Sequence, residues 1–334
     1  MTDVAFIGTG TIASIHLARL EAVDDATVVA VCDIDDERAR EAATPWDASV
    51  FTDHGTMFAE MDFDAVFVCL PPFAHTDQEL LAAEHGVDLF VEKPLSLDIE
   101  YAREVREAVE QAGIVTQVGH MDRYTDIAER ASELLGDRPI ALADGRWFGG
   151  VPGVGWWGRS ARSGGQTVEQ AVHIYDLVRQ FAGDVTRVSA VGGQTVVTEK
   201  IDFPDSTTAS LEHANGAVGH VSASSASPGD DVSLTIVGED AALDLDFTHG
   251  TLDGQVDGEE IHYENDAEVR WSDYRGGNDA FQKELEDFLA AVRAGDPDRP
   301  RSPYADALRS FEVTLAVNES IETGVPVDIT TDGV

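Results

Sequence analysis

The chain has 334 residues, of which 43% are hydrophobic and 25% are charged, enough apolar material for two domains with buried cores. Its 63 acidic residues outnumber 22 Lys and Arg, which gives a formal net charge of −41. This charge argues against binding to nucleic acid or to an anionic membrane, and no apolar run approaches the roughly 20 residues of a membrane span.

The basic residues are almost all arginines, since Lys93, Lys200 and Lys283 are the only lysines. An acidic, lysine-poor surface repels itself in dilute buffer, whereas molar salt shortens the Debye length to about 3 Å and screens the repulsion. We therefore expect a halophilic protein of a high-salt cytosol. The alternative is an acidic protein adapted to ordinary salt. A cytoplasmic location is expected because the chain runs into a strand-like segment without a basic leader region.

The first 120 residues alternate short apolar runs with amphipathic stretches, as in a parallel sheet with crossover helices. The predicted strands are 3–8, 27–33, 64–70, 87–92 and 114–119, and the predicted helices are 11–22, 35–43, 73–85 and 97–112. Gly86 and Gly113 stand where helix C-terminal glycines belong. The pattern predicts a doubly wound α/β domain over residues 1–122.

The pattern changes after Gly119, and it predicts an α+β domain over residues 123–334 with a large, mostly antiparallel sheet. The predicted elements are a helix at 125–135, a strand at 139–148, a helix at 166–182, hairpins over 185–264, helices at 278–294 and 303–322, and a strand at 325–329. Helix 303–322 is a candidate to pack back on the first domain. We expect this second domain to bind substrate and to form the oligomer contact.

Strand 3–7 leads into Gly8-Thr9-Gly10-Thr11-Ile12-Ala13, a G-x-G-x-x-A turn that opens a helix. Glycines allow a tight turn and the close approach of a pyrophosphate to the helix N-terminus, where free N–H groups favour an anion. The second predicted strand ends in Asp33, at the distance that the dinucleotide-binding pattern requires. The alternatives are a structural glycine turn and a plain strand-end aspartate.

A carboxylate at Asp33 accepts ribose hydroxyls and repels a 2′-phosphate, so NAD is favoured over NADP. NADP stays open because Arg38 follows five positions later. The two cysteines, Cys32 and Cys69, lie in apolar runs and are expected to be buried thiols, without a disulfide or zinc site. No metal-binding motif is present in the sequence.

Five segments together resemble the glucose-fructose oxidoreductase / inositol dehydrogenase / rhizopine catabolism (Gfo/Idh/MocA) family. They are GTGTIA (8–13), LPPFAH (70–75), VDLFVEKPLS (87–96), QVGHMDRY (117–124) and GGQTVEQAVHIYDL (164–177). On these segments the chain is identified as a member of that family, of haloarchaeal type. The resemblance spans nearly the whole chain and implies a Rossmann domain followed by a substrate domain.

The resemblance implies that Lys93 of the Glu-Lys-Pro segment reaches substrate and nicotinamide, and that His173 is the acid/base histidine. Where the family commonly has Asp four residues before this histidine, the chain has Glu169. The resemblance further implies a cofactor cleft that includes Leu70, Pro71, His75 and Glu92, and substrate-facing positions at His120, Arg123 and Tyr124.

The residues themselves support this chemistry. Glu169, His173 and Asp176 are spaced i, i+4 and i+7, so one predicted helix would present all three on one face. A neighbouring carboxylate orients an imidazole and stabilises its protonated form, which suits a general base, and a cation at Lys93 would stabilise an alkoxide. The structural alternatives are a packing histidine, a solvated lysine and an ion pair between Asp176 and Arg179.

Trp156-Trp157-Gly158-Arg159 offers aromatic faces of the kind that stack on sugar rings, together with a cation. Trp157 and Arg159 are therefore further substrate candidates. The alternative is that the tryptophans anchor a packed loop.

We expect an NAD(P)-dependent dehydrogenase or reductase acting on a secondary alcohol of a sugar, polyol or sugar derivative, with the substrate class implied by the resemblance alone. Two alternatives stay open: a redox-neutral NAD-dependent glycosidase of the same fold, and a non-enzymatic sensor of dinucleotide and sugar. The family resemblance implies a homodimer or homotetramer formed through the second-domain sheet.

Overall fold

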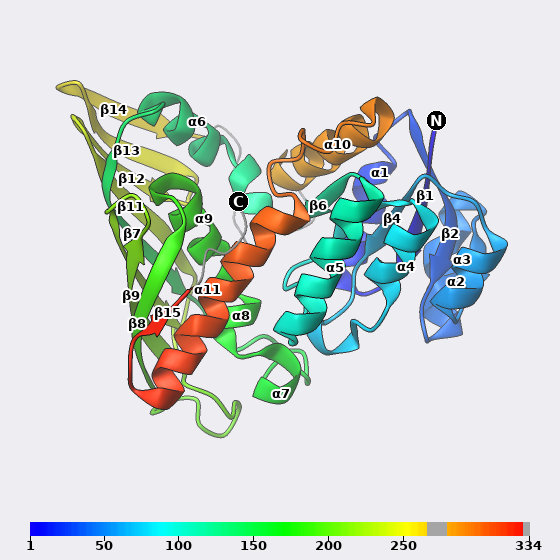
Figure 1. Cartoon of the computed structure of the whole chain (residues 1–334), viewed down its shortest axis with the longest axis horizontal. Helices are drawn as coiled ribbons and strands as arrows, with labels where there is room; N and C mark the ends of the chain where they lie inside the picture. Colours follow the sequence, from blue (N-terminus) through cyan, green and yellow to red (C-terminus); the bar gives the residue numbers. More distant parts are fainter. Residues whose placement is uncertain (266–278, 330–334) are drawn as a thin grey trace. The chain divides into compact units, whose positions relative to one another are not determined.

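The computed structural model describes residues 1–265 and 279–329, which fall into two compact units. The first consists of Met1–Met121 and Asp279–Leu308, and the second starts at Asp122 and takes in the chain again from Arg309. Figure 1 shows the elements of both.

The first unit contains a six-stranded sheet in the order β3-β2-β1-β4-β5-β6, with every neighbouring pair parallel. Its strands are β1 (Thr2–Ile7), β2 (Ala26–Cys32), β3 (Ser49–Phe51), β4 (Ala65–Val68), β5 (Asp88–Val91) and β6 (Thr116–Val118). Its helices before α10 are α1 (Thr11–Leu20), α2 (Asp36–Ala43), α3 (His54–Glu60), α4 (Gln78–His85) and α5 (Ile99–Ala112), with 3₁₀ turns η1 (Thr44–Trp46) and η2 (Pro72–Ala74). The predicted doubly wound α/β fold is confirmed.

Local sequence explains most of the helix boundaries in this unit. Asp35 and Asp98 cap α2 and α5, since each side chain accepts hydrogen bonds from backbone N–H groups of the first turn. Gly86 and Gly113 end α4 and α5 in the left-handed conformation, at φ 67° and 66°, as predicted. The sequence analysis did not predict β3 and α3. β3 has only three residues and no fully buried side chain, so it gives no apolar run to detect.

A ladder of phenylalanines forms the centre of the first core. Phe6, Phe67 and Phe90 stand in register on β1, β4 and β5, and consecutive rings stack with centroids 4.8 and 4.7 Å apart. Phe288 of α10 (Asp279–Ala294) meets the second and third rings edge-on at 5.5 Å. This packing explains why α10 belongs to the first unit, whereas the sequence analysis assigned every residue after 122 to the second domain.

Helix α11 (Tyr304–Thr323) is divided between the two units. Its first residue, Tyr304, donates its backbone N–H to Thr116 Oγ1 at 3.0 Å within the first unit. The remainder, from Arg309, belongs to the second unit. The contact to Thr116 therefore lies inside the first unit, and the packing of helix 303–322 back on the first domain stays a prediction.

The second unit contains a nine-stranded sheet in the order β14-β13-β12-β11-β7-β10-β9-β8-β15, in which only β7 and β10 pair parallel among the described strands. The strands are β7 (Ile140–Phe148), β8 (Val185–Gly193), β9 (Ser206–His213), β10 (Val218–Ser224), β11 (Asp231–Gly238), β12 (Ala241–Asp246), β13 (Thr251–Val256), β14 (Glu259–Glu264) and β15 (Val327–Asp328). Its helical segments before α11 are η3 (Met121–Tyr124), whose first residue belongs to the first unit, α6 (Asp126–Leu135), α7 (Ser160–Ser163), α8 (Gln166–Glu169) and α9 (Val172–Ala182). The predicted large, mostly antiparallel sheet is confirmed.

Helices cover one face of this sheet, and α9 lies across its middle (Figure 1). Burial alternates along β9 and β10, so that Leu211 and Val221 point toward the helices while their neighbours point outward. Gly145 on β7 permits the close approach of α9, because a Cβ there would lie 2.7 Å from Ile174. Over the described residues no helix covers the opposite face, called the outer face below.

The single helix predicted over 166–182 is two helices. The one-turn α8 ends at Glu169, and α9 starts at Val172. Between them the backbone N–H of Ala171 bonds to the carbonyl oxygen of Gln166, five residues earlier, which interrupts the α-helical pattern. Glu169 and His173 therefore do not share one continuous helical face, and that expectation is wrong.

Candidate functional site

The glycine turn after β1 has the shape of an anion site. Gly8 has φ +88°, and a Cβ on it would lie 2.5 Å from the carbonyl oxygen of Cys69 and 2.9 Å from Leu70. Gly10 is the N-cap of α1 without a side-chain cap, and a Cβ on it would meet no atom within 4 Å. The first N–H groups of α1, beginning at Thr11 and Ile12, have no intrahelical acceptor, and the space around Gly10 is open beside this helix N-terminus.

Asp33, just after β2, is held against this turn. Its Oδ2 accepts hydrogen bonds from the backbone N–H and the hydroxyl of Thr9 at 2.9 and 2.8 Å, and its Oδ1 accepts the N–H of Asp35 at 2.9 Å. Arg38, the nearby cation, is exposed on α2 and pairs with Asp35 at 3.5 Å. The carboxylate of Asp33 is thus placed beside the glycine turn, as ribose recognition requires.

Glu92, which precedes Lys93, is a buried carboxylate with a partner that the sequence analysis missed. His16 Nε2 on α1 lies 2.7 Å from Glu92 Oε1, and both side chains are buried. Gly119 makes room for this carboxylate, because a Cβ there would lie 2.7 Å from Oε2. The lysine that follows is half-buried. A histidine on the buried face of α1 was the available signal, but no spacing rule names its partner.

His75 belongs to a second buried group, after Leu70, Pro71 and η2. Its Nδ1 lies 2.5 Å from Glu79 Oε1, and Tyr101 donates its hydroxyl to Glu79 Oε2 at 2.6 Å. Burial raises the pKa of Glu79, but the charge and hydrogen bond of His75 and the hydrogen bond of Tyr101 outweigh it and hold that pKa below its usual value. His75 Nε2 is buried without a hydrogen-bond partner in the described part of the chain.

These residues fit a dinucleotide. The open helix N-terminus suits a pyrophosphate, Asp33 suits the adenosine ribose, and the buried Nε2 of His75 suits a polar group of the cofactor. Lys93 follows β5 at the carboxyl edge of the parallel sheet, the edge at which such folds bind their ligands.

In the second unit His173 stands on the first turn of α9, at 4% exposure. The indole of Trp147 on β7 stacks on the imidazole, with centroids 5.4 Å apart and planes at 15°. Asp122 of η3 places its Oδ2 3.8 Å from His173 Nδ1. The sequence analysis named neither Trp147 nor Asp122, because both meet His173 only through the fold.

Glu169, predicted to orient His173, accepts a hydrogen bond at its Oε2 from the Nε1–H of Trp157. Trp157 is 1% exposed and packs against Ile201 and Phe203. This burial favours the packed loop anchor over a stacking surface for sugars. Arg159 is exposed, 3.9 Å from Asp202, and stays a substrate candidate.

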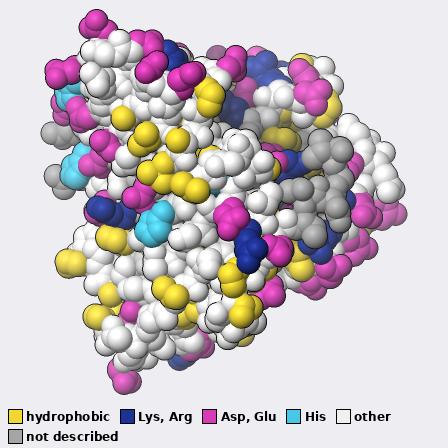
Figure 2. All heavy atoms as spheres, turned by 60° about the vertical axis from the view of Figure 1, so that its left-hand side comes forward, with side chains coloured by type: hydrophobic (Ala, Val, Ile, Leu, Met, Phe, Trp, Pro, Cys, Tyr) yellow, Lys and Arg dark blue, Asp and Glu magenta, His cyan; other side chains and the backbone are white. Residues whose placement is uncertain are grey.

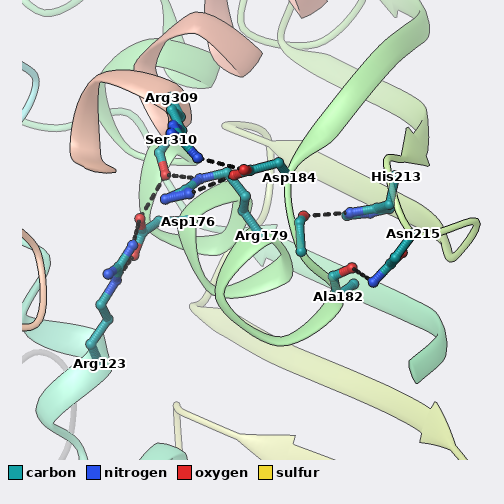
Figure 3. Close-up of polar contacts among 10 residues, drawn as sticks. Arg123, Asp176, Arg179, Ala182, Asp184, His213, Asn215, Arg309 and Ser310 are labelled. Carbon is teal, nitrogen blue, oxygen red and sulfur yellow. Dashed lines mark hydrogen bonds and ion pairs between the residues drawn. The ribbon is translucent and has the colours of Figure 1, made fainter. Parts of the chain in front are cut away.

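Arg123, predicted to face the substrate, and Asp176, predicted to share a helical face with His173, bind each other (Figure 3). Arg123 Nε donates to Oδ2 at 2.6 Å and Nη2 donates to Oδ1 at 2.5 Å, and Ser310 Oγ donates to Oδ1 at 2.7 Å. Arg179, the partner considered from sequence, bonds to Asp184 and Ser310. The geometry of this pair favours a positioning role. Tyr124 and His120 are buried, the latter in the first unit.

Cys32 and Cys69 are buried free thiols, and burial raises the pKa of Cys32 to about 11, with Asp53 and Asp33 adding to the shift. Within residues 1–265 and 279–329, no group of three His, Cys, Asp or Glu side chains is arranged to hold a metal ion. Over the same ranges, no helix combines the length and apolar character needed to cross a bilayer.

Comparison with known proteins adds independent findings. Residues 2–120 match the family described as "Oxidoreductase family, NAD-binding Rossmann fold" and residues 135–244 match the "GFO/IDH/MocA C-terminal domain". The chain is 28% identical to scyllo-inositol 2-dehydrogenase (NAD(+)) of Bacillus subtilis, covering 97% of this chain and 95% of the relative. It is 25% identical to D-xylose 1-dehydrogenase (NADP(+)) 2 of Haloferax volcanii, covering 88% and 90%.

Solved structures agree on the fold. Levoglucosan dehydrogenase in complex with NADH and L-sorbose aligns with a TM-score of 0.86 at 21% identity, over 98% of this chain and 99% of that one. GenD2 from gentamicin A biosynthesis, in complex with NAD, aligns with a TM-score of 0.84 at 24% identity, over 99% and 97%. The chain belongs to the Gfo/Idh/MocA oxidoreductase family, and its first unit is an NAD-binding Rossmann domain.

Proposed function

We propose that the protein is an NAD-dependent dehydrogenase or reductase that acts on a secondary alcohol or its carbonyl in a sugar, polyol or sugar derivative. The observation that carries this proposal is that one chain contains two features. Lys93 follows β5 at the edge of the parallel sheet where a dinucleotide binds, and the buried His173 of the second unit has a carboxylate within 4 Å. The names of the relatives, dehydrogenases of inositol and of xylose, support the substrate class.

In the oxidising direction, His173 takes the proton of the substrate hydroxyl while Lys93 stabilises the negative charge that develops on the oxygen. The oxygen then forms the carbonyl double bond as the C–H electron pair leaves the same carbon. The bound nicotinamide supplies the acceptor for that hydride. In the reducing direction His173 returns the proton. Glu169 acts indirectly, by holding the Trp157 loop beside α9.

The family lysine should not tolerate the conservative change Lys93→Arg, because a guanidinium keeps the charge but alters the donor geometry. We expect kcat to fall by about 100-fold, the order of loss when a charge-stabilising donor is displaced. The assay is absorbance of reduced nicotinamide at molar KCl, over aldoses, inositols, sugar acids and sugar alcohols. Lys200→Arg, an exposed lysine outside the site, is the matched control.

Wild-type turnover by Lys93→Arg would rule out the role assigned to Lys93. If the wild type binds the dinucleotide but the absorbance of reduced nicotinamide changes with no compound of the panel, the result would point instead to the redox-neutral glycosidase or to the sensor.

The cofactor is NAD, and we propose that Asp33 sets the preference over NADP. Asp33→Asn keeps a similar shape but removes the charge that repels a 2′-phosphate. The affinity for NADH should fall and that for NADPH should rise, changing their ratio by about 10-fold or more, because hydrogen bonds to charged groups contribute about 1.5–3 kcal/mol. Fluorescence titration of both reduced cofactors measures this. Asp36→Asn, exposed on α2, is the charge control, and an unchanged ratio would contradict the assignment.

We propose that the chain forms a homodimer or homotetramer through the outer face of the second-unit sheet. Figure 2 turns this side of the molecule forward and shows apolar side chains in several places on it, among white atoms of other side chains and backbone and some charged and His side chains. Val191 and Val218 point outward with 66% and 52% exposure. A shallow groove of about 570 Å³ lies on the same sheet, lined by Phe148, Val191 and a run of Ser and Thr from β9 and β10. Such surface is unusual for a chain of charge −41 and favours a buried interface.

Sedimentation at molar KCl should therefore give a dimer or tetramer. Val218→Asp places a charge on the outer face and should shift the protein toward the monomer, because an unpaired charge in an interface is costly to desolvate. A wild-type monomer over the micromolar range would refute the interface.

We also propose that the protein works in the cytoplasm of a high-salt cell, since its acidic surplus needs screening. The midpoint of thermal unfolding should rise as KCl is increased from 0.1 to 2 M. A midpoint that falls with KCl, in a protein stable without it, would contradict adaptation to salt.

A further inference from the structure

The proposed base, His173, needs a carboxylate that fixes its ring and stabilises its imidazolium form. Two carboxylates lie near it in the sequence, and other groups engage both. Glu169 lies before the break between α8 and α9 and accepts a hydrogen bond from Trp157. Asp176 accepts two hydrogen bonds from Arg123 and one from Ser310.

We propose that Asp122 is the carboxylate that orients His173 and stabilises its protonated form; the inference rests on the proposed function of His173 as acid and base. Asp122 Oδ2 lies 3.8 Å from His173 Nδ1, and the residue is 1% exposed. At that burial the attraction between a carboxylate and an imidazolium is screened far less than in water. With Nδ1 facing Asp122, the proton exchanges with the substrate oxygen at Nε2.

The fold positions Asp122 from both sides. Its backbone carbonyl accepts hydrogen bonds from the hydroxyl and the N–H of Thr125, at 2.8 and 3.3 Å, where α6 begins. The next residue, Arg123, makes the bidentate pair with Asp176 on α9, the helix that carries His173 (Figure 3). Since Asp176 lies three residues after His173, this ion pair brings Asp122 to the first turn of α9.

The ring of His173 is fixed as well. Trp147 stacks on it nearly in parallel, which limits rotation and leaves the ring nitrogens at its edge. The strands packed against α9 contribute apolar inward side chains, including Val221, Leu234 and Ile236. Asp122, Arg123, Glu169 and Asp176 are charged groups that lie on or next to the first half of α9. Asp122 makes an ion pair with the imidazole when His173 is protonated.

The test compares Asp122→Asn with Glu169→Gln, both nearly isosteric. Asp137→Asn, an exposed aspartate of the same unit, is the control for removing one negative charge. The first readout is an NMR titration of the histidine ring protons at molar KCl, in which the signal of His173 is the one missing from His173→Asn. The second is the pH dependence of kcat.

We expect Asp122→Asn to lower the pKa of His173 by about one pH unit or more, because it removes the adjacent negative charge. The acidic limb of the kcat profile should move down by the same amount, and kcat on the plateau should fall about 10-fold or more because the ring loses its orientation. Glu169→Gln should change the pKa of His173 by no more than the control Asp137→Asn does. Asp122→Glu, which restores the charge, should return the pKa toward the wild-type value.

An unchanged pKa of His173 in Asp122→Asn, or a larger drop in Glu169→Gln, would overturn the proposal. If Asp122→Asn does not fold, Asp122→Ser removes the same charge and is read in the same way. The titration needs no substrate. Absence of activity on every sugar would therefore contradict the proposed function, while the effect of Asp122 on the pKa of His173 could still be measured.

Discussion

A buried ion pair, Arg123 with Asp176, is the constraint on which the second unit's candidate chemistry depends. Removing one partner of such a pair leaves an uncompensated buried charge and costs about 3–5 kcal/mol. The pair ties the turn that carries Asp122 to the helix that carries His173, and Ser310 adds α11 to the same group. Arg179 bonds to Ser310 and to Asp184, so the polar contacts continue from the buried Asp176 to the partly exposed Asp184 (Figure 3).

In the first unit the candidate site depends on apolar packing. A core of stacked aromatic rings lies on the strands whose carboxyl ends carry the polar residues. The stacked rings of Phe6, Phe67 and Phe90 fix three central strands in register, and the carboxyl ends of those strands carry the residues that we propose to bind the dinucleotide. Two buried histidine–carboxylate contacts, of His16 with Glu92 and of His75 with Glu79, lie just behind that edge. Side chains held by such contacts lose little freedom when a ligand binds, which is how a preformed site lowers the cost of binding.

The sequence alone determined the local and periodic features. The glycine turn with Asp33, the helix ends at Gly86 and Gly113, and the change from parallel to antiparallel patterning all follow from short-range rules of backbone geometry and burial. The family could also be recognised, because its motifs lie in short contiguous stretches around residues such as Lys93 and His173.

Tertiary structure decided which side chains meet. Helical periodicity placed Glu169 beside His173, but it cannot detect a break in hydrogen bonding at Ala171, where the residues on both sides remain helix-like. The contact of Asp122 with His173 and the inclusion of α10 in the first core join residues far apart in the chain. Only the packing of apolar surface and the pairing of buried charges settle such contacts, and both depend on the whole fold at once.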